Sequence, residues 1–103
     1  RVTFHYMQRN IIMENGTLTH IKPAKITVEE ISNSVCKEKL ILSYEGKPIA
    51  KFYYNMRGYN QDFSLTNSEG THFGFGGDRS KSEQVRMFKL ALKEGFTNIK
   101  HYN

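Results

Sequence analysis

Residues 70–102 read G-THFGFGGDRS-KSEQVRMFKL-ALKEGFTNIK-HY, and the architecture can be worked out from this stretch. It predicts a strand over 71–75, a glycine-rich loop, a helix from Ser80 to Glu94 and a closing strand. Ser80 and Glu83 have the S-x-x-E spacing of a capping box, which satisfies free N–H groups at a helix start. Gly95 stands where a left-handed residue ends a helix. At 100° per residue, the helix presents one apolar face for burial, formed by Val85, Phe88, Ala91 and Leu92.

The preceding residues are predicted to form a sheet that covers this apolar face. Asn15-Gly16 is the signal of a tight hairpin between a strand over Val2–Met13 and a return strand over Thr17–Ile21. Segments 40–44, 49–57, 63–66 and 71–75 alternate apolar and polar residues and are separated by turn residues. The alternation assigns to the inner face Phe52, Tyr54, Met56, Phe63, Leu65, Phe73 and Phe75.

The segment between the hairpin and this meander is predicted as a short helix near 28–37. Thr27 and Glu30 have capping-box spacing, and Val28, Ile31 and Val35 recur at helical intervals. A strand through Lys25–Ile31 is the competing interpretation. The whole predicts an α+β fold in a single domain over residues 1–103: an antiparallel meander sheet, made of the N-terminal hairpin plus three to four further strands, packed by a C-terminal helix.

Composition narrows the class of protein. The chain has 103 residues, 38% of them apolar and 13% aromatic, which is typical of a folded domain. Its net charge of +5 favours anionic partners, either nucleic acid or an acidic protein, although charge of this size also serves solubility alone. The single cysteine, Cys36, allows no intrachain disulfide and suits a reducing cytosol. No apolar run is long enough to span a bilayer, so we expect a cytoplasmic protein without membrane contact.

A first candidate binding surface is the outer face of segment 49–57. Lys51, Tyr53, Asn55 and Arg57 alternate there, and basic groups interleaved with an aromatic ring can hold phosphates and stack bases. The alternative is the ordinary polar side of a half-buried antiparallel sheet.

A second candidate is the glycine-rich loop and the helix that follows it. Glycines before a helix start leave N–H groups free for an anion, and Arg79 and Lys81 add charge there. Neither the Walker A nor the G-x-G-x-x-G pattern is present. Arg86, Lys89 and Lys93 extend a basic stripe along the helix, although such stripes are usually solvated faces.

The predicted order of elements is similar in layout to a double-stranded RNA-binding domain. The matching positions are Gly74, Gly76, Ser80 and Lys81, and the resemblance implies that Lys81 contacts phosphate. The sequence departs from that pattern at Ser82, where the family usually has a second lysine, and at Gln84 and Phe88, where it has small alanines.

Catalysis has one weak candidate, His72, which follows a turn and would lie near Lys51 or Arg57 if the strands pair suitably. A histidine base beside cations is the minimum for RNA cleavage without a metal. No metal-binding motif or cofactor motif is present, so neither a metal nor a cofactor is expected. Cys36 on the predicted helix lies beside Val35 and is better explained by packing than by nucleophilic chemistry.

We therefore expect, first, a small basic non-enzymatic nucleic-acid-binding or regulatory protein. Its phosphate contacts would come from Lys51, Tyr53, Asn55, Arg57, Arg79, Lys81, Arg86, Lys89 and Lys93. The alternative is a protein–protein interaction or inhibitor module of a mobile element or phage. Met87 and Leu90 lie off the buried helix face, and their exposure would favour a partner or a homodimer. The second alternative is a small metal-independent ribonuclease.

Overall fold

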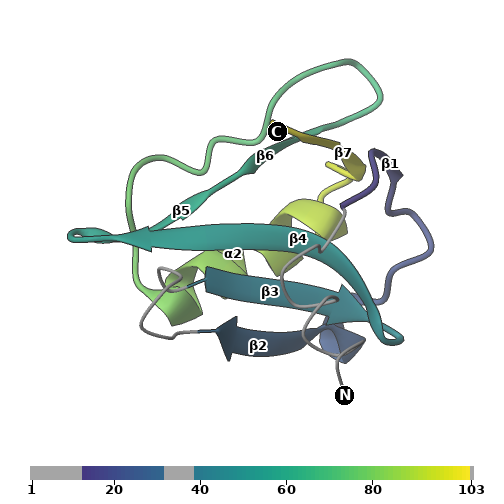
Figure 1. Cartoon of the computed structure of the whole chain (residues 1–103). Helices are drawn as coiled ribbons and strands as arrows, with labels where there is room; N and C mark the ends of the chain where they lie inside the picture. Colours follow the sequence, from purple (N-terminus) through teal and green to yellow (C-terminus); the bar gives the residue numbers. More distant parts are fainter. Residues whose placement is uncertain (1–12, 32–38, 103) are drawn as a thin grey trace.

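The computed structural model describes residues 13–31 and 39–102, which form two antiparallel sheets and one α-helix (Figure 1). The first sheet has the order β1–β7–β6 and comprises β1 (Gly16–Thr17), β7 (Asn98–His101) and β6 (Phe63–Thr66). The second has the order β2–β3–β4–β5 and comprises β2 (Thr27–Ile31), β3 (Lys39–Tyr44), β4 (Lys47–Asn55) and β5 (Gly58–Gln61). A single-turn 3-10 helix, η1 (Pro23–Lys25), precedes β2, and the helix α2 (Lys81–Lys93) connects the Gly-rich loop to β7.

The four-stranded sheet is an antiparallel meander, because each strand pairs with the next one along the chain. Its strands β3 and β4 correspond to the predicted segments 40–44 and 49–57, whereas the predicted segment 63–66 is β6 of the other sheet. The β3–β4 turn is made by Glu45 and Gly46, which both have positive φ. The β4–β5 turn ends at Gly58, whose φ of +140° is favourable only for glycine. The α+β architecture expected from the sequence is confirmed.

Helix α2 begins with the Ser80 half of the predicted capping box and ends at the predicted Gly95, whereas the Glu83 carboxylate pairs with Arg86. The Ser80 hydroxyl accepts a hydrogen bond from the Glu83 backbone N–H at 3.3 Å. At the other end Gly95 has a φ of +93°, and its N–H donates to the Leu92 carbonyl while that of Phe96 donates to Ala91. This pair of bonds is a Schellman motif, which satisfies the last helix carbonyls and turns the chain toward β7.

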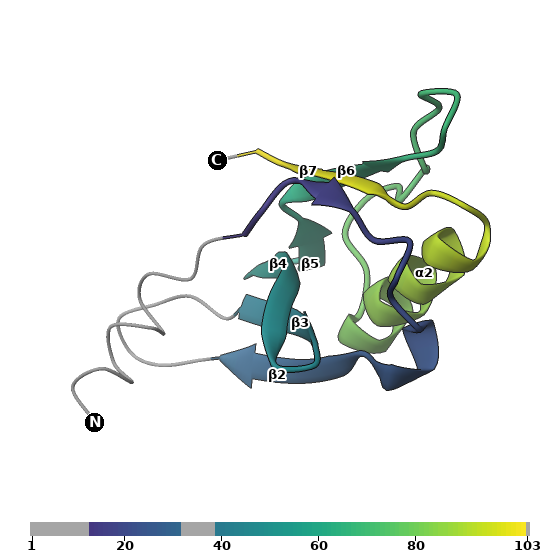
Figure 2. The ribbon, with the colours of Figure 1, turned by 90° about the vertical axis from the view of Figure 1, so that its right-hand side faces the viewer.

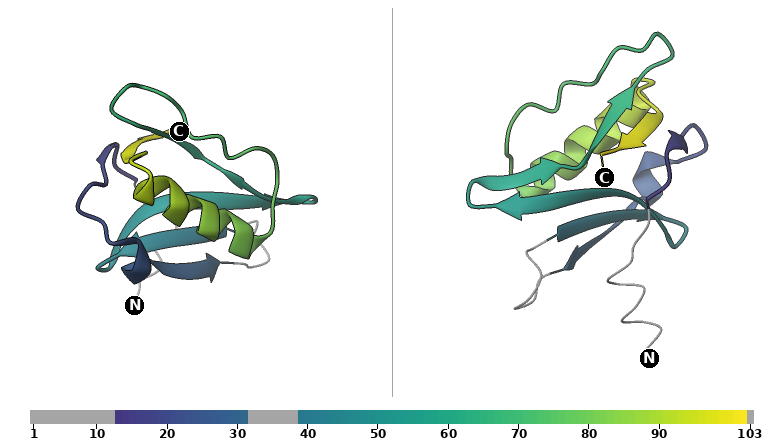
Figure 3. Two further views of the ribbon diagram at one scale, coloured as in Figure 1. Left: turned by 180° about the vertical axis from the view of Figure 1, so that it is seen from behind. Right: turned by 45° about the horizontal axis from the view of Figure 1, so that its top comes forward.

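The core lies between the two sheets and α2, which covers one face of the four-stranded sheet (Figures 2 and 3). Phe63 is fully buried at its centre. Its ring makes edge-to-face contacts with Phe52, Phe75 and Phe88 at centroid distances of 5.2, 5.5 and 5.6 Å. Such aromatic pairs add about 0.5–1.5 kcal/mol each to the stabilisation from burial.

The helix predicted near 28–37 is wrong for its first residues, because Thr27–Ile31 is strand β2, as in the competing interpretation. Three of its five residues are β-branched and suit an extended strand that pairs with β3. The Thr27 hydroxyl donates to the Ser43 carbonyl at 3.4 Å instead of capping a helix. Residues 32–38, including Cys36, lie outside the described residues. Among the described residues, the segment directly before 32–38 is thus a strand, whereas the layout of the RNA-binding domain has a helix before the meander.

Two predicted strands also differ. Gly16–Thr17 pairs with β7, and the rest of the return strand predicted over Thr17–Ile21 is a turn; its partner over Val2–Met13 is described only at Met13. Residues 71–75 form no strand beyond a single bridge between His72 and Thr66. The glycines at 74, 76 and 77 leave this segment as a loop, although Phe75 is still buried.

The inner-face assignment holds for Phe52 but fails toward the end of β4. Met56 is 96% exposed, because it lies in the β4–β5 turn beyond the edge of the core. Tyr54 is also exposed and packs its ring edge-to-face on Tyr59 at 5.1 Å.

Candidate binding groove between strand β2 and helix α2

The outer face of β4 carries the first candidate surface. Lys51 forms an ion pair with Asp62 at 3.1 Å, and its side chain is only 19% exposed. The Asn55 amide donates to Asp78 at 3.2 Å and accepts from the backbone N–H of Arg57 at 2.7 Å. Tyr53 and Arg57 are exposed. Two of these four side chains are therefore engaged in contacts within the chain.

The Gly-rich loop uses Arg79 for its own structure. The Arg79 backbone forms an antiparallel bridge with Tyr59, with hydrogen bonds of 2.7 and 3.0 Å. Its Nε donates to the Phe75 carbonyl at 2.9 Å. Arg79 thereby holds the loop against β5. These structural contacts account for an arginine at this position, so no bound anion is needed to explain it.

The cations of helix α2 differ in their pairing. Lys81 forms an ion pair with Glu30 of β2 at 2.8 Å, and Arg86 pairs with Glu83 within the helix at 2.5 Å. Over residues 13–31 and 39–102, Lys89 and Lys93 form no ion pair. They are the cations of the predicted stripe that are free for a partner.

The two basic surfaces lie on opposite sides of the four-stranded sheet. α2 covers one face of the four-stranded sheet (Figure 2), and Phe52 belongs to the core on that face. Because side chains alternate along a strand, Lys51 and Tyr53 face away from α2. One continuous surface for all nine predicted residues is therefore not formed. The helix side is the more defined of the two, because it contains a groove.

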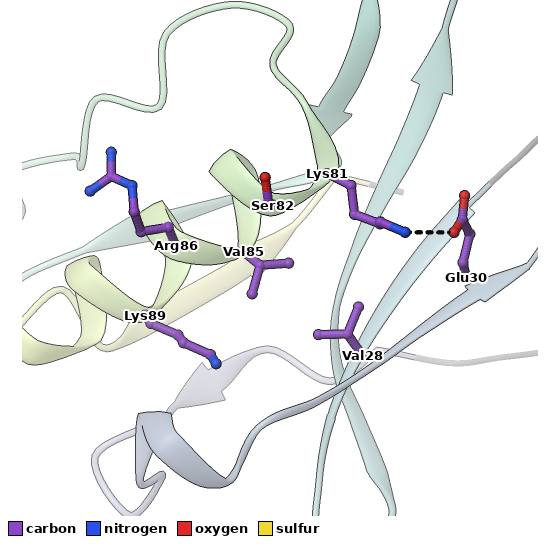
Figure 4. A pocket seen from close by; sticks show the side chains of 7 residues that line it. All are labelled: Val28, Glu30, Lys81, Ser82, Val85, Arg86 and Lys89. Atoms are coloured by element: carbon purple, nitrogen blue, oxygen red, sulfur yellow. Dashed lines mark hydrogen bonds and ion pairs between the residues drawn. The ribbon is translucent and has the colours of Figure 1, made fainter.

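The groove lies between β2 and α2 and has a volume of about 670 Å³. Figure 4 shows the seven side chains that line it: Val28, Glu30, Lys81, Ser82, Val85, Arg86 and Lys89. Val28 and Glu30 pair across the sheet with Leu42 and Leu40, both core residues, which places them on the α2 side of β2.

One end of the groove is an ion pair held from three elements. Glu30 accepts from the Lys81 ammonium with Oε1 and from the Tyr59 hydroxyl with Oε2, at 2.8 and 2.9 Å. The hydrogen bond from Lys81 lowers the pKa of Glu30 below its usual value, with further contributions from Tyr59 and from the Lys81 charge. Glu30 is thus a carboxylate at neutral pH, and its charge is balanced by Lys81.

The other end of the groove is lined by two apolar side chains and a lysine. Val28 is 42% exposed, and Val85 on the facing helix turn is half-buried. Lys89 extends from α2 toward the β2 side, whereas Arg86 points away from β2 (Figure 4). An unpaired ammonium beside an apolar floor can bind a carboxylate or a phosphate attached to an apolar or extended group.

Sequence reasoning found the cations of this groove but missed Val28 and Glu30, because it placed them on a helix. The alternation signal of a short edge strand is weak in a five-residue segment that also has capping-box spacing. Only the competing interpretation, a strand through Lys25–Ile31, would have placed Val28 and Glu30 on a sheet.

Exposure of Met87 and Leu90 would indicate a surface for a partner or a homodimer. Met87 is half-buried and packs against the core, while Leu90 is 37% exposed. Leu90 alone is too small an apolar patch to indicate a homodimer.

The weak catalytic candidate, His72, is exposed and bridges to Thr66 beside β6. Neither β4 nor the β4–β5 turn pairs with it, so the expected pairing beside Lys51 or Arg57 is not formed. In the part of the chain that the structure describes, no three His, Cys, Asp or Glu side chains gather as metal ligands would. No helix among the same residues is long and apolar enough to cross a membrane.

Comparison with known protein families, with curated proteins and with solved structures finds no match for this chain.

Proposed function

We propose that this protein is a small interaction module that holds an acidic segment of a protein partner in the β2–α2 groove. The observation that carries the proposal is Lys89, a cation without an acidic partner among the described residues, next to the apolar floor of Val28 and Val85. Specific binding sites commonly combine apolar contact area with a few placed polar or charged groups.

The groove supports a protein segment better than a nucleic-acid backbone. A phosphate backbone needs a row of free cations, but Lys81 and Arg86 are already paired and Glu30 adds a negative charge. An acidic segment needs one carboxylate near Lys89 and an apolar contact on Val28.

The test is a displayed library of random nine-residue peptides selected on the purified protein. Enriched peptides are then synthesised, and their affinity is measured for the wild type, for Lys89→Glu and for Lys93→Glu. Both variants change the helix charge equally, but only Lys89 lines the groove. We expect acidic peptides, a loss of about tenfold or more for Lys89→Glu, and a change of less than about twofold for Lys93→Glu.

Two results would contradict the proposal. One is a library that yields no enriched peptide. The other is an equal loss in both variants, because that result means general charge attraction rather than binding in the groove.

Nucleic acid is the second candidate. It is favoured by Lys89 and Lys93 of α2, which form no ion pair within residues 13–31 and 39–102, on a chain of net charge +5. It is tested by fluorescence anisotropy with labelled single-stranded and double-stranded DNA and RNA at two salt concentrations. Binding that falls steeply with salt, and that Lys89→Glu and Lys93→Glu weaken equally, would support this candidate instead.

A further inference from the structure

Strand β2 is an edge of its sheet. It is the terminal strand in the order β2–β3–β4–β5 and pairs through Thr27–Ile31 with β3 on one side. On its other side no strand pairs with it within residues 13–31 and 39–102. In such a strand alternate residues direct their N–H and C=O groups outward, and these unpaired groups are a template for a further strand.

The facing wall of the groove has the spacing that an added strand requires. Lys81, Val85 and Lys89 follow each other at intervals of four residues along α2 and all line the groove (Figure 4). Four residues of helix rise about 6 Å. Alternate side chains on one face of a strand are about 6.6–6.8 Å apart. A strand along β2 would therefore present successive groove-side residues to successive turns of α2.

The charges around β2 specify which residues that strand would carry. Val28 and Lys89 favour an apolar and an acidic side chain, two positions apart, on the groove side. Glu29 is opposite Ile41 in the β2–β3 register, so it faces away from α2, and the described residues give it no ion pair. The residue between the acidic and apolar positions would lie on this other side, opposite Thr27 and diagonal to Glu29, where a long basic side chain can reach the Glu29 carboxylate.

We propose that β2 accepts an extended segment of a partner protein as a fifth strand, with an acidic–basic–apolar sequence across the groove. The inference rests on the proposed function and names the form in which the partner binds. Main-chain hydrogen bonds to an edge strand supply affinity, and alternate side chains supply specificity, in known recognition of this kind.

A second copy of this chain is a poorer occupant. Antiparallel pairing of two β2 strands brings the Glu29–Glu30 pairs of both chains together, and like charges opposite each other destabilise a strand pair. A partner with a basic residue facing Glu29 avoids this repulsion.

The experiment uses two blocked seven-residue probes of identical composition. The first is acetyl-Thr-Thr-Glu-Lys-Val-Thr-Thr-amide, and in the second the Glu and Lys are exchanged, which moves the acid to the wrong side of the strand. We expect the first to bind at least about tenfold more tightly than the second. We also expect NMR hydrogen exchange to show slowed amides at alternate residues of Thr27–Ile31 when the first probe binds.

Backbone pairing is tested without altering the protein, by N-methylation of the first probe at alternate amides. One alternating set should abolish binding and the other should retain it, because only one set faces β2. If neither set weakens binding and no β2 amide is protected, strand addition is wrong.

The remaining outcomes separate the two proposals. Library peptides that depend on Lys89, together with unprotected β2 amides, would overturn strand addition and leave the proposed function standing. Absence of any peptide binding would overturn both. If the β2 amides are protected without peptide, and the protection rises with protein concentration, the occupant of the β2 edge is a second copy of this chain and not a partner segment.

Discussion

Replacement of the buried Gln84 by Met is expected to stabilise the protein. Gln84 lies in the first turns of α2 and is completely buried. Its Nε2 donates to the Tyr59 carbonyl at 2.8 Å, but its Oε1 has no hydrogen-bond partner among the described residues. The Tyr59 carbonyl also accepts from the Arg79 N–H at 3.0 Å, so it stays satisfied when the glutamine amide is removed.

The expected free-energy change follows from these contacts. Loss of the Gln84–Tyr59 hydrogen bond lowers the free energy of unfolding by about 1 kcal/mol, and removal of the unpaired buried side-chain carbonyl raises it by about 1–3 kcal/mol. Met has nearly the volume of Gln and flexible rotamers, so it adds no cavity and little strain. The balance is a stabilisation of about 1 kcal/mol, or about 4–8 °C in Tm for a domain of this size.

The assay is urea unfolding followed by far-UV circular dichroism, with Gln84→Ala as the control. The alanine variant removes the same polar group but leaves a cavity, so we expect it to be less stable than Gln84→Met by about 2 kcal/mol or more. Destabilisation of Gln84→Met by more than about 1 kcal/mol would refute the reasoning. It would mean that the amide holds α2 on β5 through more than the one bond to Tyr59.

Three further perturbations test a turn, a half-buried histidine and the cap of α2. Gly58→Ala should destabilise by about 1–3 kcal/mol or more, because φ is +140° there and a Cβ would stand 2.7 Å from the Arg79 carbonyl oxygen; Gly74→Ala, whose Cβ meets nothing within 4 Å, is the matched control and should be close to neutral in urea unfolding. Burial lowers the pKa of His101, and the charge of Lys51 lowers it further, while the hydrogen bond to the Glu14 backbone and the charge of Asp62 raise it. Because the net shift is downward, the unfolded chain binds the proton more readily than the folded chain. Wild-type stability should therefore fall as the pH is lowered from 7 through the usual histidine value of about 6.5, and an unchanged slope in His101→Gln would show that this histidine is not responsible. Ser80→Ala should cost about 1 kcal/mol in thermal unfolding through loss of the α2 cap, whereas Ser82→Ala should cost much less; equal effects would argue against the cap.

The elements predicted best are those whose signals lie within a few residues. Helix α2 begins directly after Ser80 and ends close to Gly95, almost as predicted, because capping residues satisfy backbone groups of the same turn. The alternation from Leu40 to Tyr44 and from Ile49 to Asn55 likewise predicted β3 and β4. The basic residues of the helix were also visible in the sequence.

The division into two sheets depends on contacts between distant residues. Leu65 pairs with Ile99 and Gly16 also pairs with Ile99, so β7 draws β1 and β6 into a sheet separate from the meander. No local pattern specifies such pairs, since they form only when burial of the shared core brings the segments together.

The groove is decided in the same way. Thr27–Ile31 has local signals for both helix and strand, and pairing with the buried strand β3 selects the strand. The Lys81–Glu30 ion pair then joins residues 51 positions apart, and Lys89, on the β2 side of α2, has no ion pair in the described part of the chain. Residue types and helix ends follow from short-range chemistry, but which charges remain free follows from tertiary packing, because an ion pair needs both partners within a few ångströms.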